Sequence, residues 1–226
     1  MGIIVAIDGP AGSGKSTTAK AVARQLGFTY VDTGAMYRAI TLKVLRSAVA
    51  IEDSTAIVDL ARRSEIHFRL LEGDLHIFLD GEDVSQAIRS SAVAQVVSTV
   101  SAIAGVRAIL VQRQRELAET TDIVMEGRDI GTNVFPNAQF KFYLSADLPT
   151  RAQRRIADYE RVGQKLTQAE IIEELKKRDK IDSSRQSAPL RKAADAIEID
   201  TSNLKFEDQV SAIVDHVRTG INQSEG

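Results

Sequence analysis

The fold is decided by one stretch of sequence, Gly9-Pro10-Ala11-Gly12-Ser13-Gly14-Lys15-Ser16. It fits the pattern G-x-x-x-x-G-K-[ST], whose glycines let several backbone N–H groups point into one concavity that holds phosphate. In that pattern Lys15 reaches the β- and γ-phosphates, and the Ser16 hydroxyl can ligate Mg²⁺. Thr17 can add a further contact. The stretch therefore predicts a binding site for ATP or GTP over residues 9–17.

The segments on either side of this loop have the character that such a site needs. Ile3–Ile7 is a continuous apolar run, which is typical of a strand buried on both faces of a parallel sheet. Lys15–Leu26 has apolar residues at helical spacing, and Gly27 follows as a stop signal. Phe28–Val31 is a second short strand. Strand, loop, helix and strand together predict a βαβ unit with the phosphate loop inside it.

The rest of the chain alternates between apolar strands and amphipathic helices. Further strands are expected at 123–125, 140–144 and 196–200. Helices are expected at 35–46, 55–63, 90–119 with a break near 104–105, 149–161, 167–182 and 206–218. Segments 65–70 and 75–80 alternate instead, with a turn at Gly73-Asp74 and another at 81–83. The pattern predicts an α/β fold, with a five-stranded parallel sheet covered by helices on both faces and a small antiparallel β insert.

The composition excludes several classes of protein. The 226 residues carry 29 Lys+Arg and 31 Asp+Glu, so a broadly basic surface for nucleic acid or anionic membrane is not expected. There is no cysteine, which excludes disulfides, zinc–cysteine sites and a thiol nucleophile. The N-terminal apolar run is too short for a signal peptide, and no stretch approaches a membrane span. We expect a soluble, cytoplasmic protein.

The signals that accompany the loop favour a small-molecule kinase over other nucleotide-binding proteins. A GTPase would carry an Asn-Lys-x-Asp motif, and the sequence has none. The only candidate for the acidic strand of a motor ATPase is Ile123–Glu126, and Gly127-Arg128 follows it at once. The chain instead offers scattered arginines, whose planar guanidinium groups bind phosphate oxygens in pairs.

Four motifs in order give a specific resemblance. They are GPAGSGKST at 9–17, DTGAMYR at 32–38, EGRDIG at 126–131, and RDKIDSSR at 178–185 followed by Ala188-Pro189-Leu190. This set resembles the bacterial cytidylate kinases, which belong to the nucleoside monophosphate kinases, and the likeness covers nearly the whole chain. The inserted sheet near 65–88 is also a feature of the bacterial form. The sequence departs from the family at Glu126, where aspartate is usual.

The resemblance implies a P-loop NTPase three-layer fold and transfer of the γ-phosphoryl group of ATP to CMP or dCMP. It implies Mg²⁺ held through Ser16, and a monomer without nucleic acid or membrane partners. It implies catalytic roles for Lys15, Arg128, Arg154 and Arg155. It implies substrate binding by Tyr37, Arg38, Ser98, Arg107, Arg128, Asp129, Arg178, Asp182 and Arg185. The expected parts are a core at 1–35, 101–150 and 166–226, an acceptor region at 36–100 and a helical lid at 151–165.

Several alternatives stay open at the level of the sequence. Either Arg154 or Arg155 can be the lid residue that reaches the transferring phosphate, and Arg151 shares their helix. Asp8 can hold a metal-bound water or simply cap local structure, and the role of Glu126 is not assigned. Each nominated arginine can also be an ordinary surface or ion-paired residue. The alternative functions are an adenylate-type or shikimate-type kinase and a nucleotide-binding regulator without catalysis. The three histidines have no metal-like spacing and are interpreted as structural.

Overall fold

The chain divides into two compact units in the computed structural model, which describes residues 2–71, 74–161, 163 and 166–224. The first unit comprises Met1–Val31 and Leu117–Gly226, and the second comprises Asp32–Glu116. Residues 101–116 were expected in the core, but they lie in the second unit. The reason is that Val106 and Leu110 share one buried apolar cluster with Met36 and Ile57.

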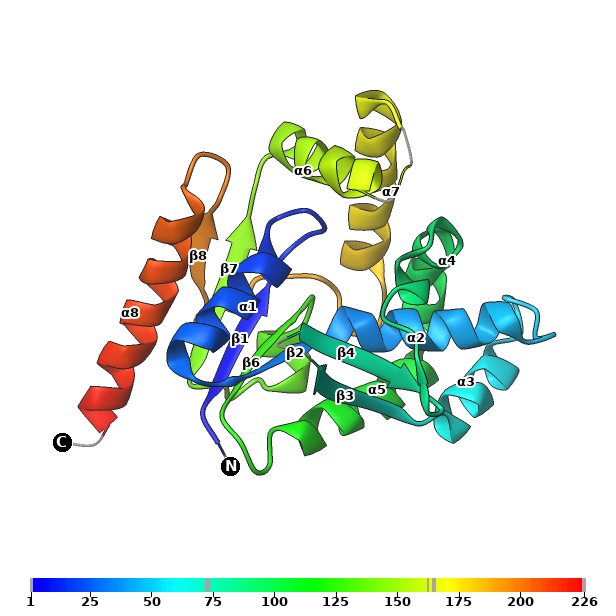
Figure 1. The fold of residues 1–226 in the computed structure, drawn as a ribbon, viewed down its shortest axis with the longest axis horizontal. Coiled ribbons are helices and arrows are strands. Elements are labelled where there is room, and N and C mark those ends of the chain that lie inside the picture. The colour runs from blue at the N-terminus through cyan, green and yellow to red at the C-terminus, as the bar shows by residue number, and fades with distance from the viewer. Residues whose placement is uncertain (1, 72–73, 162, 164–165, 225–226) are drawn as a thin grey trace. The chain divides into compact units, whose positions relative to one another are not determined.

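A five-stranded parallel sheet forms the centre of the first unit and confirms the predicted fold class (Figure 1). Its strands are β1 (Ile4–Asp8), β2 (Thr29–Asp32), β6 (Ile123–Gly127), β7 (Phe140–Ser145) and β8 (Ile197–Asp200), in the order β2-β6-β1-β7-β8. The strand β1 is central and pairs in parallel with β6 and β7. All five of its residues are buried. Its continuous apolar run is therefore explained by neighbours on both edges and both faces.

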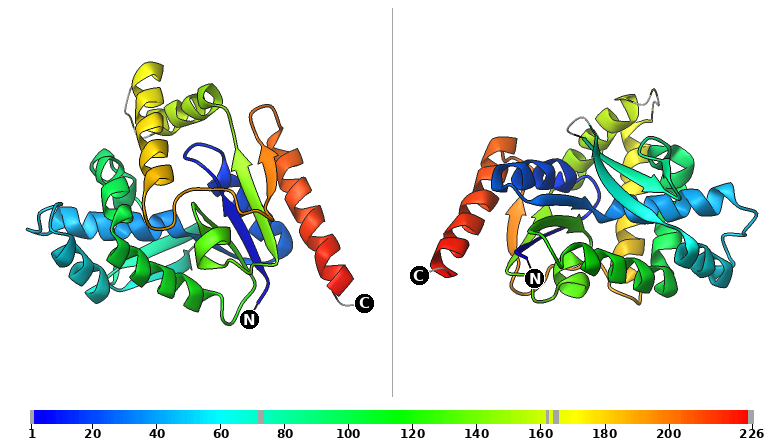
Figure 2. Two further views of the ribbon diagram at one scale, coloured as in Figure 1. Left: turned by 180° about the vertical axis from the view of Figure 1, so that it is seen from behind. Right: turned by 60° about the horizontal axis from the view of Figure 1, so that its bottom comes forward.

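Two helices pack on one face of this sheet, as the two views of Figure 2 show. They are α1 (Lys15–Leu26) and α8 (Phe206–Ser224). Their buried side chains, including Val22 and Ile213, join those of β1 and β7 in one apolar cluster. The helix α1 ends where predicted, because Gly27 adopts the left-handed conformation at φ 74°.

Two further helices of the first unit lie next to the phosphate loop and cross at a steep angle in Figure 1. They are α6 (Leu148–Arg161) and α7 (Gln168–Ser184). Ala152 of α6 and Leu175 of α7 are buried in a cluster that also contains Ala11 of the loop. Thr167 and Glu170 form a capping box that starts α7. Part of the expected lid, residues 162, 164 and 165, lies outside the described residues.

The second unit contains the predicted small antiparallel sheet. Its strands are β3 (Ile66–Leu71), β4 (Asp74–Leu79) and β5 (Glu82–Asp83), in the order β3-β4-β5. Gly73 of the predicted hairpin turn lies outside the described residues. The helices of this unit are α2 (Thr33–Arg46), α3 (Ser54–Arg63), α4 (Ser91–Ala102) and α5 (Ala104–Leu117), with a short 3₁₀ turn at Ala87–Arg89.

The expected helical region 90–119 is in fact two helices. The axes of α4 and α5 are bent by 93° at the break, close to the predicted position. Among the described residues no single helix is long and apolar enough to cross a membrane, and only this bent pair taken together reaches that length and composition.

Candidate functional site

The phosphate loop connects β1 to α1 and has the backbone that its glycines predict. Gly9 has φ 152°, and a Cβ atom built there would lie 2.1 Å from the carbonyl oxygen of Leu144. Gly14 has φ 87° and precedes α1 without a capping side chain. The first N–H groups of α1 therefore remain available to a ligand, and the positive end of the helix dipole favours an anion.

Lys15 lies inside the loop and is 5% exposed. Its Nζ donates to the carbonyl oxygen of Pro10 at 2.6 Å. Burial, together with the positive charges of Arg128 and Arg178, lowers the pKa of Lys15 well below its usual value, while Glu126 acts in the opposite direction. Because burial and neighbouring positive charges disfavour the charged form of Lys15, an anion bound beside it would stabilise that form. The charge of the site therefore favours binding of a phosphate group.

A second group of charged residues follows β6 and lines α7. The Nε of Arg128 donates to Asp182 Oδ2 at 3.0 Å, and the Nε of Arg178 lies 4.0 Å from the same oxygen. Burial would raise the pKa of Asp182, but Arg128 and Arg178 hold it below its usual value. The Nη2 of Arg185 donates to Asp129 Oδ1 at 3.3 Å. The structure therefore brings these five predicted residues together as one ion-paired cluster.

Spacings of four and three residues would put Arg178, Asp182 and Arg185 on one face of a continuous helix, and the structure differs from this. Arg178 and Asp182 lie one turn apart on α7, but the helix ends at Ser184. Arg185 has an extended backbone, and its Nε donates to the carbonyl oxygen of Ala188 at 2.6 Å. Its side chain reaches Asp129 from beyond the helix end and not from a shared helical face.

The three arginines of α6 have three different environments. Arg151 is buried, donates to the carbonyl oxygen of Ala11 at 2.7 Å and binds both carboxylate oxygens of Asp179. Arg154 donates to the carbonyl oxygen of Thr201 at 2.7 Å and to its Oγ1 at 2.9 Å. The side chain of Arg155 is 27% exposed, against 7% for Arg151. Its guanidinium lies 4.7 Å from the centre of the Tyr159 ring, and its ion pairs with Asp158 and Glu174 are long, at 3.9 Å.

Sequence reasoning missed two contributors to the phosphate loop. Thr201 follows β8 and is fully buried. Its Oγ1 lies 3.0 Å from the carbonyl oxygen of Ser13 and, as noted, accepts from Arg154. Asp179 holds Arg151 against Ala11. Asp179 stands inside the motif at 178–185, so a helical-wheel argument could have singled it out. A lone threonine after a strand carries no such signal.

Glu126 has a structural partner that the sequence did not indicate. It is buried, and its Oε1 accepts a hydrogen bond from the Tyr30 hydroxyl at 2.6 Å. This contact joins β6 to its neighbour β2, close to the end of β6 that leads into Arg128 and Asp129.

Four predicted residues lie in the second unit. Tyr37 is buried on α2, and the guanidinium of Arg107 lies 5.4 Å from the centre of its ring. Arg107 is 3% exposed and donates to the carbonyl oxygen of Ser101 at 3.3 Å. Arg38 donates to Asp32 Oδ2 at 2.7 Å. Its Nε is buried without a hydrogen-bond partner among the described residues. Ser98 is half-buried on α4.

Comparison with known proteins identifies the family. The profile of the cytidylate kinase family matches residues 5–219, which is nearly the whole chain. The chain belongs to the cytidylate kinase family. A cytidylate kinase from Caldanaerobacter subterraneus subsp. tengcongensis is 53% identical over 95% of this chain and 94% of its own. A cytidylate kinase from Desulforamulus reducens is 48% identical over 96% of this chain and 97% of its own. The predicted family is thus confirmed.

Solved structures confirm the fold. An uncharacterized protein from Eubacterium ventriosum covers 96% of this chain, and 98% of its own chain is matched, at 14% identity and a TM-score of 0.54. A gluconokinase from Sinorhizobium meliloti covers 99%, with 95% of its own chain matched, at 12% identity and a TM-score of 0.50. At such low identities the likeness concerns the fold alone.

Proposed function

We propose that this member of the cytidylate kinase family transfers the γ-phosphoryl group of ATP to CMP or dCMP, giving ADP and CDP or dCDP. The family match over residues 5–219 carries the proposal. The chemistry of the chain supports it, because phosphoryl transfer needs positioned cations and backbone amides and little covalent chemistry from the protein.

The phosphate loop and Lys15 would hold the triphosphate of ATP. The N–H groups at the start of α1 and the buried ammonium of Lys15 supply the positive field that the β- and γ-phosphates require. The exposed hydroxyl of Ser16 lies in the first turn of α1 and would hold Mg²⁺. The described residues contain no group of three or more carboxylates and histidines for a metal. A single hydroxyl fits an ion that the substrate phosphates bind, and Mg²⁺ neutralises charge on those phosphates.

The acceptor nucleotide would be bound by the arginines and carboxylates predicted for it. In the second unit, the unpartnered Nε of Arg38 is a donor that a phosphate oxygen can satisfy. Tyr37, Ser98 and Arg107 complete the proposed contacts there. In the first unit, Arg128 would bind phosphate and Asp129 would accept a hydrogen bond from the exocyclic amine of cytosine. Arg178, Asp182 and Arg185 would contact the sugar, phosphate or base.

Of the lid arginines, Arg155 is the better candidate for the transferring phosphate. Arg154 already makes two short hydrogen bonds to Thr201, whereas the ion pairs of Arg155 are 3.9 Å long. Weak pairs are exchanged for a phosphate contact at little cost. Closure of a lid at 151–165 would bring an arginine to the transferring phosphate and exclude water, which competes as an acceptor. The proposed enzyme is a monomer in the cytoplasm.

A panel of acceptors with Mg²⁺ and ATP held constant tests this function. We expect CMP and dCMP to be phosphorylated faster than UMP, AMP, GMP, dTMP and shikimate. A preference for AMP or shikimate would instead favour the related kinases. Tight binding of ATP and CMP in calorimetry without turnover would favour a regulator.

Two variants connect the panel to the site. Lys15→Ala and Arg128→Ala should each remove most of the activity with CMP while the far-UV circular dichroism spectrum is kept. Retained activity in either variant would contradict the proposed roles.

A further inference from the structure

Asp8 is buried at the end of β1, and its side chain is directed to a segment far along the chain. Its Oδ1 accepts the backbone N–H of Ile130 at 2.8 Å, and its Oδ2 accepts that of Gly131 at 2.8 Å. Only 4% of the residue is exposed. Each carboxylate oxygen therefore has a backbone partner, and the side chain anchors that segment.

The anchored segment begins directly after two proposed substrate-binding residues. Arg128 and Asp129 leave β6, and the backbone then forms a short π-helical turn over Ile130–Val134. The two amides held by Asp8 are the first two of this turn. Arg128 and Asp129 are therefore held at both ends. Before them, Gly127 pairs with Asp8 in the β1–β6 ladder. After them, the Asp8 carboxylate holds the amides of Ile130 and Gly131.

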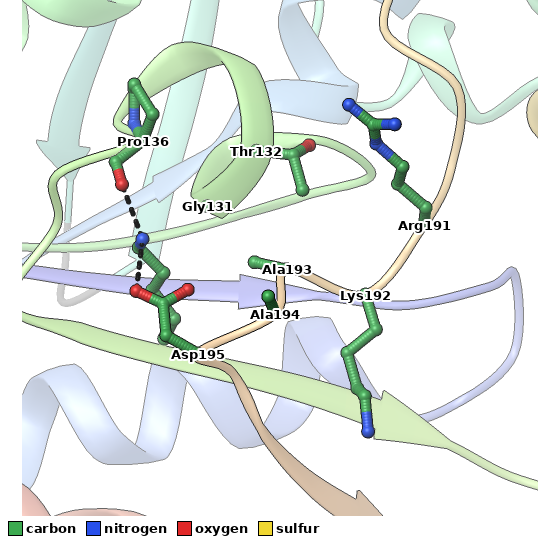
Figure 3. Close-up of a pocket in the computed structure, with 9 residues that line it drawn as sticks. Gly131, Thr132, Pro136, Arg191, Lys192, Ala193, Ala194 and Asp195 are labelled. Atoms are coloured by element: carbon green, nitrogen blue, oxygen red, sulfur yellow. Dashed lines mark hydrogen bonds and ion pairs between the residues drawn. The ribbon is translucent and has the colours of Figure 1, made fainter.

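The side chain of Lys141 packs against the turn at Gly131. A Cβ atom built on Gly131 would lie 3.2 Å from Cδ of Lys141 and 3.5 Å from Asp8 Oδ2. Lys141 is itself held by the carbonyl oxygen of Pro136 and by Asp195, the pair of contacts dashed in Figure 3. Gly131, Thr132 and Asp195 also help to line a cavity of about 450 Å³, and Figure 3 draws the residues that line it.

We propose that Asp8 is a positioning residue, whose carboxylate holds the turn Ile130–Val134 and thereby sets Arg128 and Asp129 for the acceptor nucleotide. This inference rests on the proposed function for the roles of those two residues. The two-point bond requires a carboxylate. An asparagine has one acceptor oxygen, and its NH₂ group would face a backbone N–H.

The ionisation of Asp8 gives this anchor a signature that can be observed. Burial raises the pKa of Asp8 to about 6, against the effect of the two amide hydrogen bonds. The charged or titratable groups that face it are Asp129, which raises the value further, Lys15, which lowers it, and Tyr143 on β7. Near neutral pH the carboxylate is charged and accepts both bonds, and in acid one oxygen carries a proton.

The first test compares Asp8→Asn with a matched control, Asp122→Asn. Asp122 also accepts a backbone N–H across the sheet, from Ile3 at 2.7 Å, but it lies at the opposite end of β6 from Arg128. We expect Asp8→Asn to lower kcat/KM for CMP by about tenfold or more, since small misplacement of a binding group costs up to roughly 100-fold. The loss of kcat/KM for CMP should exceed any change in the KM for ATP, and the control should leave both values unchanged.

Three outcomes of this comparison would overturn the inference. They are an unchanged kcat/KM for CMP in Asp8→Asn, an equal loss toward ATP and CMP, and the same kinetic loss in the control.

The second test uses the wild-type chain, so its result does not depend on whether a variant folds. Backbone amide resonances of Ile130 and Gly131 are followed by NMR from pH 7.5 down to pH 4. Both should move with one common midpoint, near the raised pKa of about 6. Amides that do not titrate together would overturn the anchor. If both amides titrate but the wild-type chain does not phosphorylate CMP, the proposed function has failed and not the anchor.

Discussion

The hydroxyl of Thr201 is a small group on which both Arg154 and the phosphate loop depend. Thr201→Val keeps the shape of the side chain and removes only its polar atom. The Nη1 of Arg154 then loses its 2.9 Å partner, and the carbonyl oxygen of Ser13 loses a donor at 3.0 Å. The contact with Ser13 is buried, whereas the contact with Arg154 is part-buried and Nη1 keeps a longer bond, of 3.4 Å, to the carbonyl oxygen of Gly12.

The expected magnitude follows from these lost contacts. A hydrogen bond to a charged group contributes about 1.5–3 kcal/mol, so we expect the free energy of unfolding to fall by about 2 kcal/mol. For a chain of this size that corresponds to a decrease in Tm of roughly 4–8 °C. The backbone bond from Arg154 Nη2 to the carbonyl oxygen of Thr201 persists and limits the effect.

Thermal unfolding and the KM for ATP are the two measurements. Thr201→Ser retains the hydroxyl and should lie close to the wild type in both, while Thr201→Val should raise the KM for ATP several-fold. In a double-mutant cycle, Thr201→Val should cost less when Arg154 is already alanine, because the two residues act through one contact. The reasoning is refuted if valine and serine variants have the same Tm and KM, or if the two changes are additive.

Three further predictions follow from the geometry. Gly9→Ala should abolish ATP binding, measured by calorimetry, because its Cβ would lie 2.1 Å from a β7 carbonyl oxygen. At Gly163 a Cβ would have no atom within 4 Å, so Gly163→Ala should lower the free energy of unfolding by only about 1 kcal/mol. Since the folded pKa of Asp8, about 6, lies above the unfolded value of 3.8, the folded state binds the proton more tightly, and this group's contribution to stability should decline as the pH rises from about 4 to about 6. Denaturant midpoints across that range should therefore change less in Asp8→Asn, and identical slopes would contradict the prediction. Arg155→Ala should lower kcat with little change in Tm, while Arg151→Ala should lower Tm as well, because it leaves a buried carbonyl oxygen and a carboxylate without their donor.

Local sequence patterns were sufficient to predict the sheet, the phosphate loop and the family. The continuous apolar runs at β1 and β6 indicate burial on both faces. The run in β1 continues up to Asp8, its last residue, and the run in β6 continues up to Glu126, the last residue but one. The helix α1 has its stop signal in the next residue, Gly27. Each of these features is encoded within a few neighbouring residues, so a single sequence is enough.

Features that depend on distant partners could not be predicted in this way. Arg151 looks like its two neighbours on α6, but only the fold brings it to Ala11 and Asp179. Thr201 has no distinguishing neighbours along the chain. The sequence also did not indicate that the second unit extends to residue 116. Leu110 belongs to this unit because of its apolar contacts with α2, and no break in the sequence marks the boundary.

The central place of β1 in the sheet also constrains the order in which this protein can be made. Its register pairs Ile4 with Ile123, so β1 lacks this partner until the chain has grown by more than one hundred further residues. At roughly 5–20 residues per second, that wait lasts on the order of 10 s. The second unit, Asp32–Glu116, is continuous in sequence and can fold during this interval. The phosphate loop directly follows β1, so we expect its final shape to form only after the partner strands β6 and β7 have been synthesised.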